Sequence, residues 1–124
     1  SAALLGLGTA DDAPAVASRQ AALAIVIQGQ ASDGGWGPYT NAPSEAFDTA
    51  VAVLALDGLR PRPALAAPAM TVQAWRRAID RGRAYLRAQQ EPDGSWVETT
   101  RPSGQESYSQ RVSTTAWALR ALLP

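Results

Sequence analysis

The side chains with catalytic potential in this chain are few, and they are acids. Glu45 and Asp48 lie three positions apart at the predicted start of a helix, so both carboxylates fall on the same side of its first turn. Such a pair could supply an acid for proton transfer. Negative charge in the first turn also stabilises a helix, and we favour this structural interpretation. Asp11 and Asp12, just before Pro14, are interpreted as capping residues.

The residue types that are missing exclude most other catalytic chemistry. The 124 residues contain no histidine and no cysteine, and all eleven basic residues are arginines. Zinc sites built from Cys and His, thiol nucleophiles, a Ser-His-Asp triad and Schiff-base lysines are therefore excluded. The sequence predicts neither a metal site nor a cofactor.

Charge and hydropathy limit the partners. Eleven acidic residues balance the eleven arginines, so no net charge attracts a phosphate backbone, and we expect no nucleic acid partner. The longest apolar run, residues 21–27, is much shorter than the roughly 20 residues that span a bilayer, so we expect no integral membrane segment. Residues 1–8 carry no basic leader, and the sequence fits a soluble protein that is either cytoplasmic or exported after processing.

The chain contains an internal repeat: residues 20–59 and 80–123 are copies of one unit. Four residues of the first copy recur 60 positions later, which pairs Gln30, Asp33, Gly34 and Trp36 with Gln90, Asp93, Gly94 and Trp96. Further along, residues 48–56 match residues 114–122 at an offset of 66. The connection within the second copy is therefore six residues longer.

Each copy predicts two helices joined by a glycine-rich loop. In the first copy they span about 14–28 and 44–57, and Gly58 is predicted to end the second helix in a left-handed conformation. In the second copy, a helix is predicted after Thr71, with Asp80 placed to pair with Arg76 or Arg83 on its polar face. Its apolar stripe has spacings of three and four and contains Val72, Trp75, Ile79, Gly82 and Leu86.

The second helix of each copy is the more apolar one. Residues 46–56 include only two polar side chains, and residues 116–123 are similar, so we expect both segments to be covered on most sides. Their alanines permit close helix contact. The sequence thus predicts an all-α domain of αα-hairpin repeats with about four main helices, in which the first helix of each hairpin lies outside and the second inside.

We predict a single domain over 1–124. Its parts are a remnant of a preceding repeat at 1–12, a first hairpin at 13–60, a proline-rich linker at 61–71 and a second hairpin at 72–124.

The second copy carries a family resemblance. Its residues follow the order basic, small, aromatic, aliphatic, Gln and Gly-x-Trp, in Arg81, Gly82, Tyr85, Leu86, Gln90, Gly94 and Trp96. This pattern resembles the QW motif of squalene-hopene cyclases and related terpenoid cyclases. The first copy has Ala21 and Ile25 at the basic and aromatic positions and keeps the rest. The likeness covers nearly all of residues 13–123 and extends to protein prenyltransferases.

The resemblance implies that the hairpins form part of an α/α toroid. It also implies structural roles for the motif residues Gln30, Gly34, Trp36, Gln90, Gly94 and Trp96. In that family the glutamine amide caps a neighbouring helix and stacks on the tryptophan. From the residues themselves, we interpret the two tryptophans as loop-to-helix packing and each Asp-Gly pair as an Asx turn with glycine at positive φ.

The residues that carry activity in these families are incomplete here. Class II terpenoid cyclases protonate their substrate with an Asp-x-Asp-Asp-Thr-Ala segment, and the similar stretch at 45–50 has Phe47 in the place of the proton donor. Asp48 matches only its neighbour. Protein prenyltransferases hold zinc with Asp, Cys and His, and two of these residue types are missing.

We therefore expect a non-catalytic QW-repeat module that serves as a scaffold or binds an apolar ligand or partner. The alternative is a fragment or subunit of a terpenoid cyclase that acts on an isoprenoid, with Glu45 and Asp48 as its candidate acids. An arc of two hairpins leaves inner-helix surface uncovered, so we expect self-association or further repeats, or an isoprenoid or other apolar small molecule. The surface candidates are Phe47, Val51 and Trp117.

Overall fold

The computed structural model describes residues 13–39, 41–59, 69–97 and 108–123, with backbone alone for 13–17, 69–71 and 108–109. These residues form four helices and no named strand, which confirms the all-α prediction. The helices are α2 (Ala13–Gln28), α3 (Ala46–Gly58), α4 (Ala69–Gln89) and α5 (Tyr108–Leu122). The expected remnant at 1–12 and residues 61–68 of the expected linker lie outside the described residues.

Two helix starts differ from the prediction. The helix α4 begins at Ala69, so it includes three residues assigned to the linker, and its predicted start after Thr71 is wrong. Two of the residues that it adds, Ala69 and Met70, are strong helix formers. The helix α3 begins at Ala46, because Glu45 before it is extended, with φ −132° and ψ 151°.

The end of α3 also differs. Gly58 belongs to the helix, and the glycines with positive φ in the described residues are Gly34 and Gly94. Leu59 follows with φ −99° and donates its N–H to the carbonyls of Ala55 and Leu56. The left-handed stop at Gly58 is therefore wrong. The side chain of Leu59 is buried in the core. The chain reaches this position with an ordinary negative φ and needs no left-handed residue before it.

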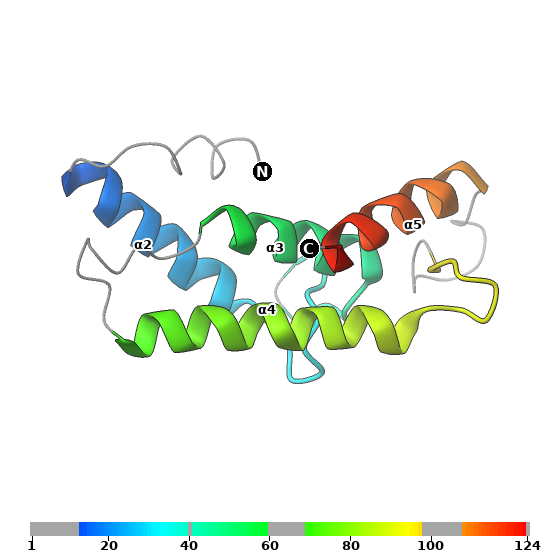
Figure 1. The fold of residues 1–124 in the computed structure, drawn as a ribbon, viewed down its shortest axis with the longest axis horizontal. Helices are drawn as coiled ribbons and strands as arrows, with labels where there is room; N and C mark the ends of the chain where they lie inside the picture. Colours follow the sequence, from blue (N-terminus) through cyan, green and yellow to red (C-terminus); the bar gives the residue numbers. More distant parts are fainter. Residues whose placement is uncertain (1–12, 40, 60–68, 98–107, 124) are drawn as a thin grey trace.

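The helix α4 runs along one side of the molecule, and α2, α3 and α5 follow one another along its length (Figure 1). The central helix, α3, packs mainly against α4 and α5. Its buried residues are Ala46, Thr49, Ala50, Val53, Ala55 and Leu56. This agrees with the prediction that α3 is covered on most sides.

The predicted stripe of α4 faces this core. Trp75, Ile79, Gly82 and Leu86 are buried, and Val72 is half-buried. The indole of Trp75 donates a 2.6 Å hydrogen bond to the carbonyl of Leu56 near the end of α3. None of the helices in the described part of the chain is long and apolar enough to cross a membrane.

The helix α5 is less covered than predicted. Its buried residues are Thr114, Ala118 and Ala121, whereas Leu119 and Leu123 are exposed. The expectation that 116–123 is covered on most sides is therefore wrong. The cause is position: within the described residues α3 packs against α2, α4 and α5, whereas α5 has its main contacts with α3 and α4.

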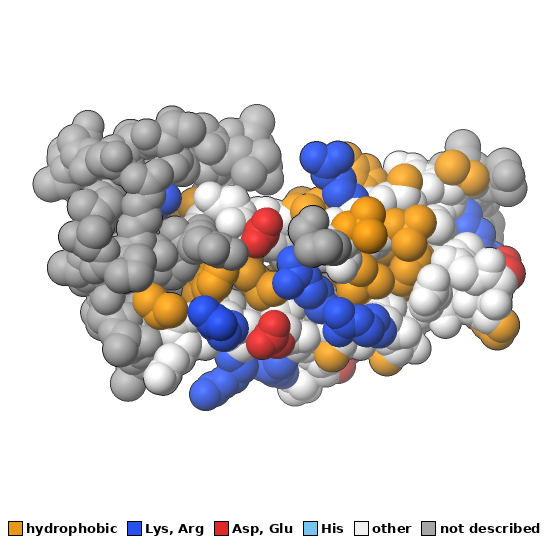
Figure 2. Space-filling model, in the orientation of Figure 1, with side chains coloured by type: hydrophobic (Ala, Val, Ile, Leu, Met, Phe, Trp, Pro, Cys, Tyr) orange, Lys and Arg blue, Asp and Glu red, His pale blue; other side chains and the backbone are white. Residues whose placement is uncertain are grey.

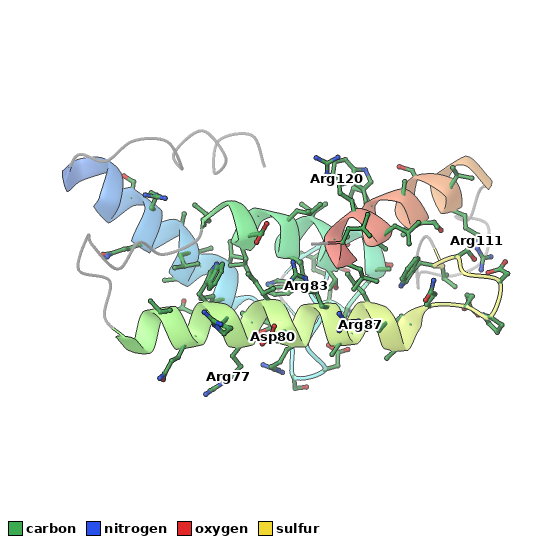
Figure 3. All side chains as sticks on the ribbon, viewed as in Figure 1. Arg77, Asp80, Arg83, Arg87, Arg111 and Arg120 are labelled. Carbon is green, nitrogen blue, oxygen red and sulfur yellow. The ribbon has the colours of Figure 1, made fainter. Side chains whose placement is uncertain are left out.

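The polar face of α4 reaches α5 through Arg83 (Figure 3). Its Nε donates a 3.1 Å hydrogen bond to the carbonyl of Ala121, a contact that the predicted pairing of Asp80 with Arg76 or Arg83 did not include. Carbonyls in the last turn of a helix lack partners within the helix and carry partial negative charge, which a guanidinium satisfies.

Candidate functional site

The two loops that carry the repeated motif have the same backbone geometry. In the first loop (residues 30–36), the N–H of Gly35 donates to Asp33 Oδ1 at 2.9 Å, and in the second loop (90–96) the N–H of Ser95 donates to Asp93 Oδ1 at 3.0 Å. Gly34 and Gly94 both have φ 92°. These observations confirm the predicted Asx turns with glycine at positive φ. Hydrogen bonds from the Ser95 hydroxyl and N–H lower the pKa of Asp93.

Both motif tryptophans bind the helix that precedes their loop. Trp36 Nε1 donates to the carbonyl of Val26 at 2.8 Å, and Trp96 Nε1 donates to that of Leu86 at 2.7 Å. Both rings are buried. They are packing residues, as the sequence predicts.

A threonine in each inner helix holds the backbone of the matching tryptophan. The N–H of Trp36 donates to Thr49 Oγ1 at 2.9 Å, and the N–H of Trp96 donates to Thr115 Oγ1 at 3.1 Å. Thr49 and Thr115 are the pair that the 66-residue offset aligns. The threonine of the cyclase-like stretch therefore has a structural role here, which the sequence analysis did not assign. Its recurrence in both copies is the signal that could have revealed it.

Gln30 joins the two hairpins. Its Nε2 donates to the carbonyl of Gly34 at 2.8 Å and to that of Ala78 in α4 at 2.9 Å. Ala78 lies in the middle of α4, so this bond is not the cap at a helix end that the resemblance implies. Gln90 makes the bond within its own loop, from Nε2 to Gly94 at 2.9 Å.

Arg81 binds the first loop from α4. Its Nη2 donates to the carbonyls of Ala31 at 3.2 Å and Ser32 at 2.9 Å, and its Nη1 lies 3.4 Å from Gln30 Oε1. The basic position of the motif thus connects one hairpin to the loop of the previous one. In the first copy this position is Ala21, which cannot make such bonds.

Tyr85, at the aromatic position of the motif, binds the same region. Its hydroxyl donates to the carbonyl of Ser44 at 3.0 Å, and Ser44 Oγ donates to Asp33 Oδ1 at 2.7 Å. Burial, followed by the negative charges of Asp33 and Glu45, raises the pKa of Tyr85 to about 12. The sequence analysis missed Ser44, because a serine at a helix start has many structural uses.

The candidate acids lie at the start of α3. Glu45 is buried at the N-cap position without a side-chain cap hydrogen bond, and Asp48 is half-buried in the first turn. Both positions are near the positive end of the helix dipole, which fits the structural interpretation. Among the described residues, no three acidic side chains gather in a way that could hold a metal ion.

The three surface candidates lie on the two inner helices. Phe47 and Val51 are four residues apart on α3, and Trp117 occupies the position in α5 that the repeat offset pairs with Val51. Phe47 is 39% exposed and Trp117 is 42% exposed, while Val51 is half-buried. Since α3 and α5 pack together, these residues belong to one pair of neighbouring helices.

Comparisons of the chain with protein-family models, with curated proteins and with solved structures find no match. We therefore base the functional proposal on the geometry of this chain.

Replacement of Thr49 by valine is expected to destabilise the fold by about 1–3 kcal/mol, because the buried N–H of Trp36 loses its acceptor. Thr115→Val is expected to cost less, since Thr115 is only partly buried. Urea unfolding of both variants measures this difference. Equal costs would contradict the assignment of Thr49 as the more critical of the two.

The two turn glycines are expected to differ in their tolerance of alanine. At Gly94, an added Cβ meets nothing closer than 3.9 Å, so only the positive φ is unfavourable, at about 1–2 kcal/mol. At Gly34, a Cβ would lie 2.6 Å from the carbonyl oxygen of Arg81, and Gly34→Ala must also displace α4. Thermal unfolding of the two variants is expected to show the larger loss for Gly34→Ala, and the reverse order would contradict this geometry.

Stability is expected to decline in alkaline solution through Tyr85. The folded pKa of about 12 lies above the ordinary 10.0, so the neutral phenol stabilises the fold fully below pH 10, and this contribution is lost as the pH rises toward 12. Tyr85→Phe is expected to be less stable at pH 8, where it lacks the bond to Ser44, and to show a shallower decline above pH 10. Urea midpoints across this range test the prediction, which parallel pH curves for the two proteins would refute.

Proposed function

We propose that the chain is a QW-type helical repeat module that binds an apolar, isoprenoid-like molecule on the exposed surface of its inner helices, and that it is not a catalyst by itself. The observation that carries the proposal is the exposure of two large aromatic side chains, Phe47 and Trp117, on α3 and α5. Water contact with such surface is unfavourable, and an apolar ligand would remove it.

The surroundings of α5 combine apolar side chains with positive charge. Figure 2 shows hydrophobic side chains gathered over α5, with arginines at the border of the patch. Figure 3 places Arg120 on one side of the patch and Arg83 and Arg87 on the other. A long apolar molecule with a polar head could bury its chain on the patch and leave the head near a guanidinium.

The use of the motif residues supports a scaffold role. The polar groups of Gln30, Trp36 and Thr49 are all engaged in hydrogen bonds that hold the loops and helices together. The equivalent bonds in the second copy maintain the same geometry. Because these groups stabilise the repeat, they are not free for chemistry on a substrate.

A terpenoid cyclase segment is the second candidate function, and the burial of Glu45, two residues before Phe47, favours it. A carboxyl group shielded from water can protonate an apolar substrate if it is held in its neutral form. We prefer the binding function, because the resemblance would place the proton donor at Phe47, which has no proton to give.

Farnesol is a suitable probe for the binding function, and tryptophan fluorescence is a suitable signal. Trp36, Trp75 and Trp96 are buried, so a change in emission on ligand binding is expected to come from Trp117. Titration is expected to give a saturable blue shift, which Trp117→Phe abolishes and Phe47→Ala weakens several-fold. Ile25→Ala, an exposed apolar position on α2, serves as the matched control and is expected to bind normally.

The same experiment separates the two candidate functions. Absence of a saturable shift, or an equal loss with Ile25→Ala, would contradict the binding proposal. Incubation with squalene tests the cyclase alternative: formation of a cyclic product that Glu45→Gln or Asp48→Asn abolishes would overturn the non-catalytic assignment.

A further inference from the structure

The two loops share one conformation but differ in what covers them. Gly34 is buried under α4, where a Cβ would lie 2.6 Å from the carbonyl oxygen of Arg81. A Cβ on Gly94 would meet only Gln90 Nε2 of its own loop, at 3.9 Å. Within the described residues, no helix therefore packs on the second loop as α4 packs on the first.

The hydrogen-bond acceptors show the same difference. Arg81 binds three acceptors of the first loop: Gln30 Oε1 and the carbonyls of Ala31 and Ser32. The equivalent acceptors in the second loop are Gln90 Oε1 and the carbonyls of Glu91 and Pro92. No arginine in the described residues donates to them. Because the two turns have matching geometry, they offer a guanidinium the same arrangement of oxygens.

The inner helices α3 and α5 also differ in how far equivalent side chains are buried. Val53 in α3 is fully buried, and a Cβ on Gly82 of α4 would lie 2.6 Å from its side chain. Its equivalent in α5, Leu119, is 46% exposed. Similarly, Ala46 is 6% exposed, whereas its equivalent Val112 is 51% exposed. Two positions that are buried on α3 are thus exposed on α5.

We propose that this C-terminal edge, formed by the acceptors at 90–92, by Val112 and Leu119 of α5 and by Leu123 just after α5, is a docking surface for another helical hairpin of the same type. The partner is defined by its chemistry. Its outer helix carries an arginine, a glycine at the next position and an aromatic hydroxyl four positions after the arginine, as α4 does in Arg81, Gly82 and Tyr85. The interface between the two hairpins of this chain is the template.

A second copy of this chain is not the partner that this edge selects. The free outer helix of such a copy is α2, which has Ala21, Ala22 and Ile25 at the three recognition positions. Ala21 and Ile25 cannot make the bonds of Arg81 and Tyr85. Gly82 has no side chain, which leaves space for Val53 of α3. The methyl of Ala22 would fill this space in a second copy, and the side chain that needs it there is Leu119, which is larger than Val53.

The proposal can be tested with an extended chain. In this chain, residues 1–123 are followed by a second copy of residues 60–123. This design presents an α4-type hairpin to the edge through the natural connecting segment. In the parent chain, Leu119→Ala is expected to change the folding equilibrium by less than about threefold, because the side chain is exposed. In the extended chain, the same substitution in the original α5 is expected to cost about thirtyfold or more, since it removes a buried leucine.

Two further variants complete the test. Replacement by alanine of the arginine in the appended hairpin that corresponds to Arg81 is expected to reduce hydrogen-exchange protection of the original α5. Ile25→Ala, on α2 at the opposite edge, is the matched control and is expected to have the same effect in both chains. Equal costs of Leu119→Ala in the two chains, or full protection without the appended arginine, would overturn the proposal.

Sedimentation of the parent chain tests the competing partner. Self-association that Leu119→Ala abolishes would show that a second copy occupies the edge, and the proposal would be wrong. A monomeric parent together with a stabilised extended chain is the expected result. Neither measurement involves farnesol, so the outcome is independent of the proposed ligand-binding function.

Discussion

The structure depends on one constraint: a polar loop lies between two helical hairpins with Gly34, Gly35 and Trp36 buried, and the backbone groups of this loop must find hydrogen-bond partners there. The side chains of Asp33, Gln30 and Thr49 bind the loop from its own hairpin, and Arg81 binds it from the next. The backbone of the turn has a fixed conformation, and this fixes the position of each side chain that binds it. The hairpins therefore cannot shift relative to one another without breaking several bonds together.

Much of this arrangement could be predicted from the sequence because the chain repeats itself. Two copies with the same Gln, Gly and Trp positions predicted two loops of one geometry, and both Asx turns have it. The apolar stripe of α4 identified its buried face, since helical periodicity depends only on local geometry. The offset of 66 aligned Thr49 with Thr115 before either threonine had an assigned role.

Features that depend on neighbouring elements could not be predicted in this way. The composition of α5 resembles that of α3, yet α5 is exposed because fewer described elements pack on it. A glycine after an apolar helix, as at Gly58, is typical of a left-handed helix end. Here Leu59 is buried without a left-handed residue before it. Residue type alone did not show whether Glu45 stabilises a helix start or acts as a catalytic acid. It also did not show whether the ring of Phe47 lies in the core or on the surface, because burial is a property of the whole fold.

The unequal covering of the two loops has a consequence for how the chain opens. Local unfolding of the first loop requires the release of Arg81 and of α4, whereas no neighbouring helix of the described residues holds the second loop. Of the two loops, the second is therefore expected to open first, and a protease would cut it before the first. A molecule that covers the second loop would slow this opening.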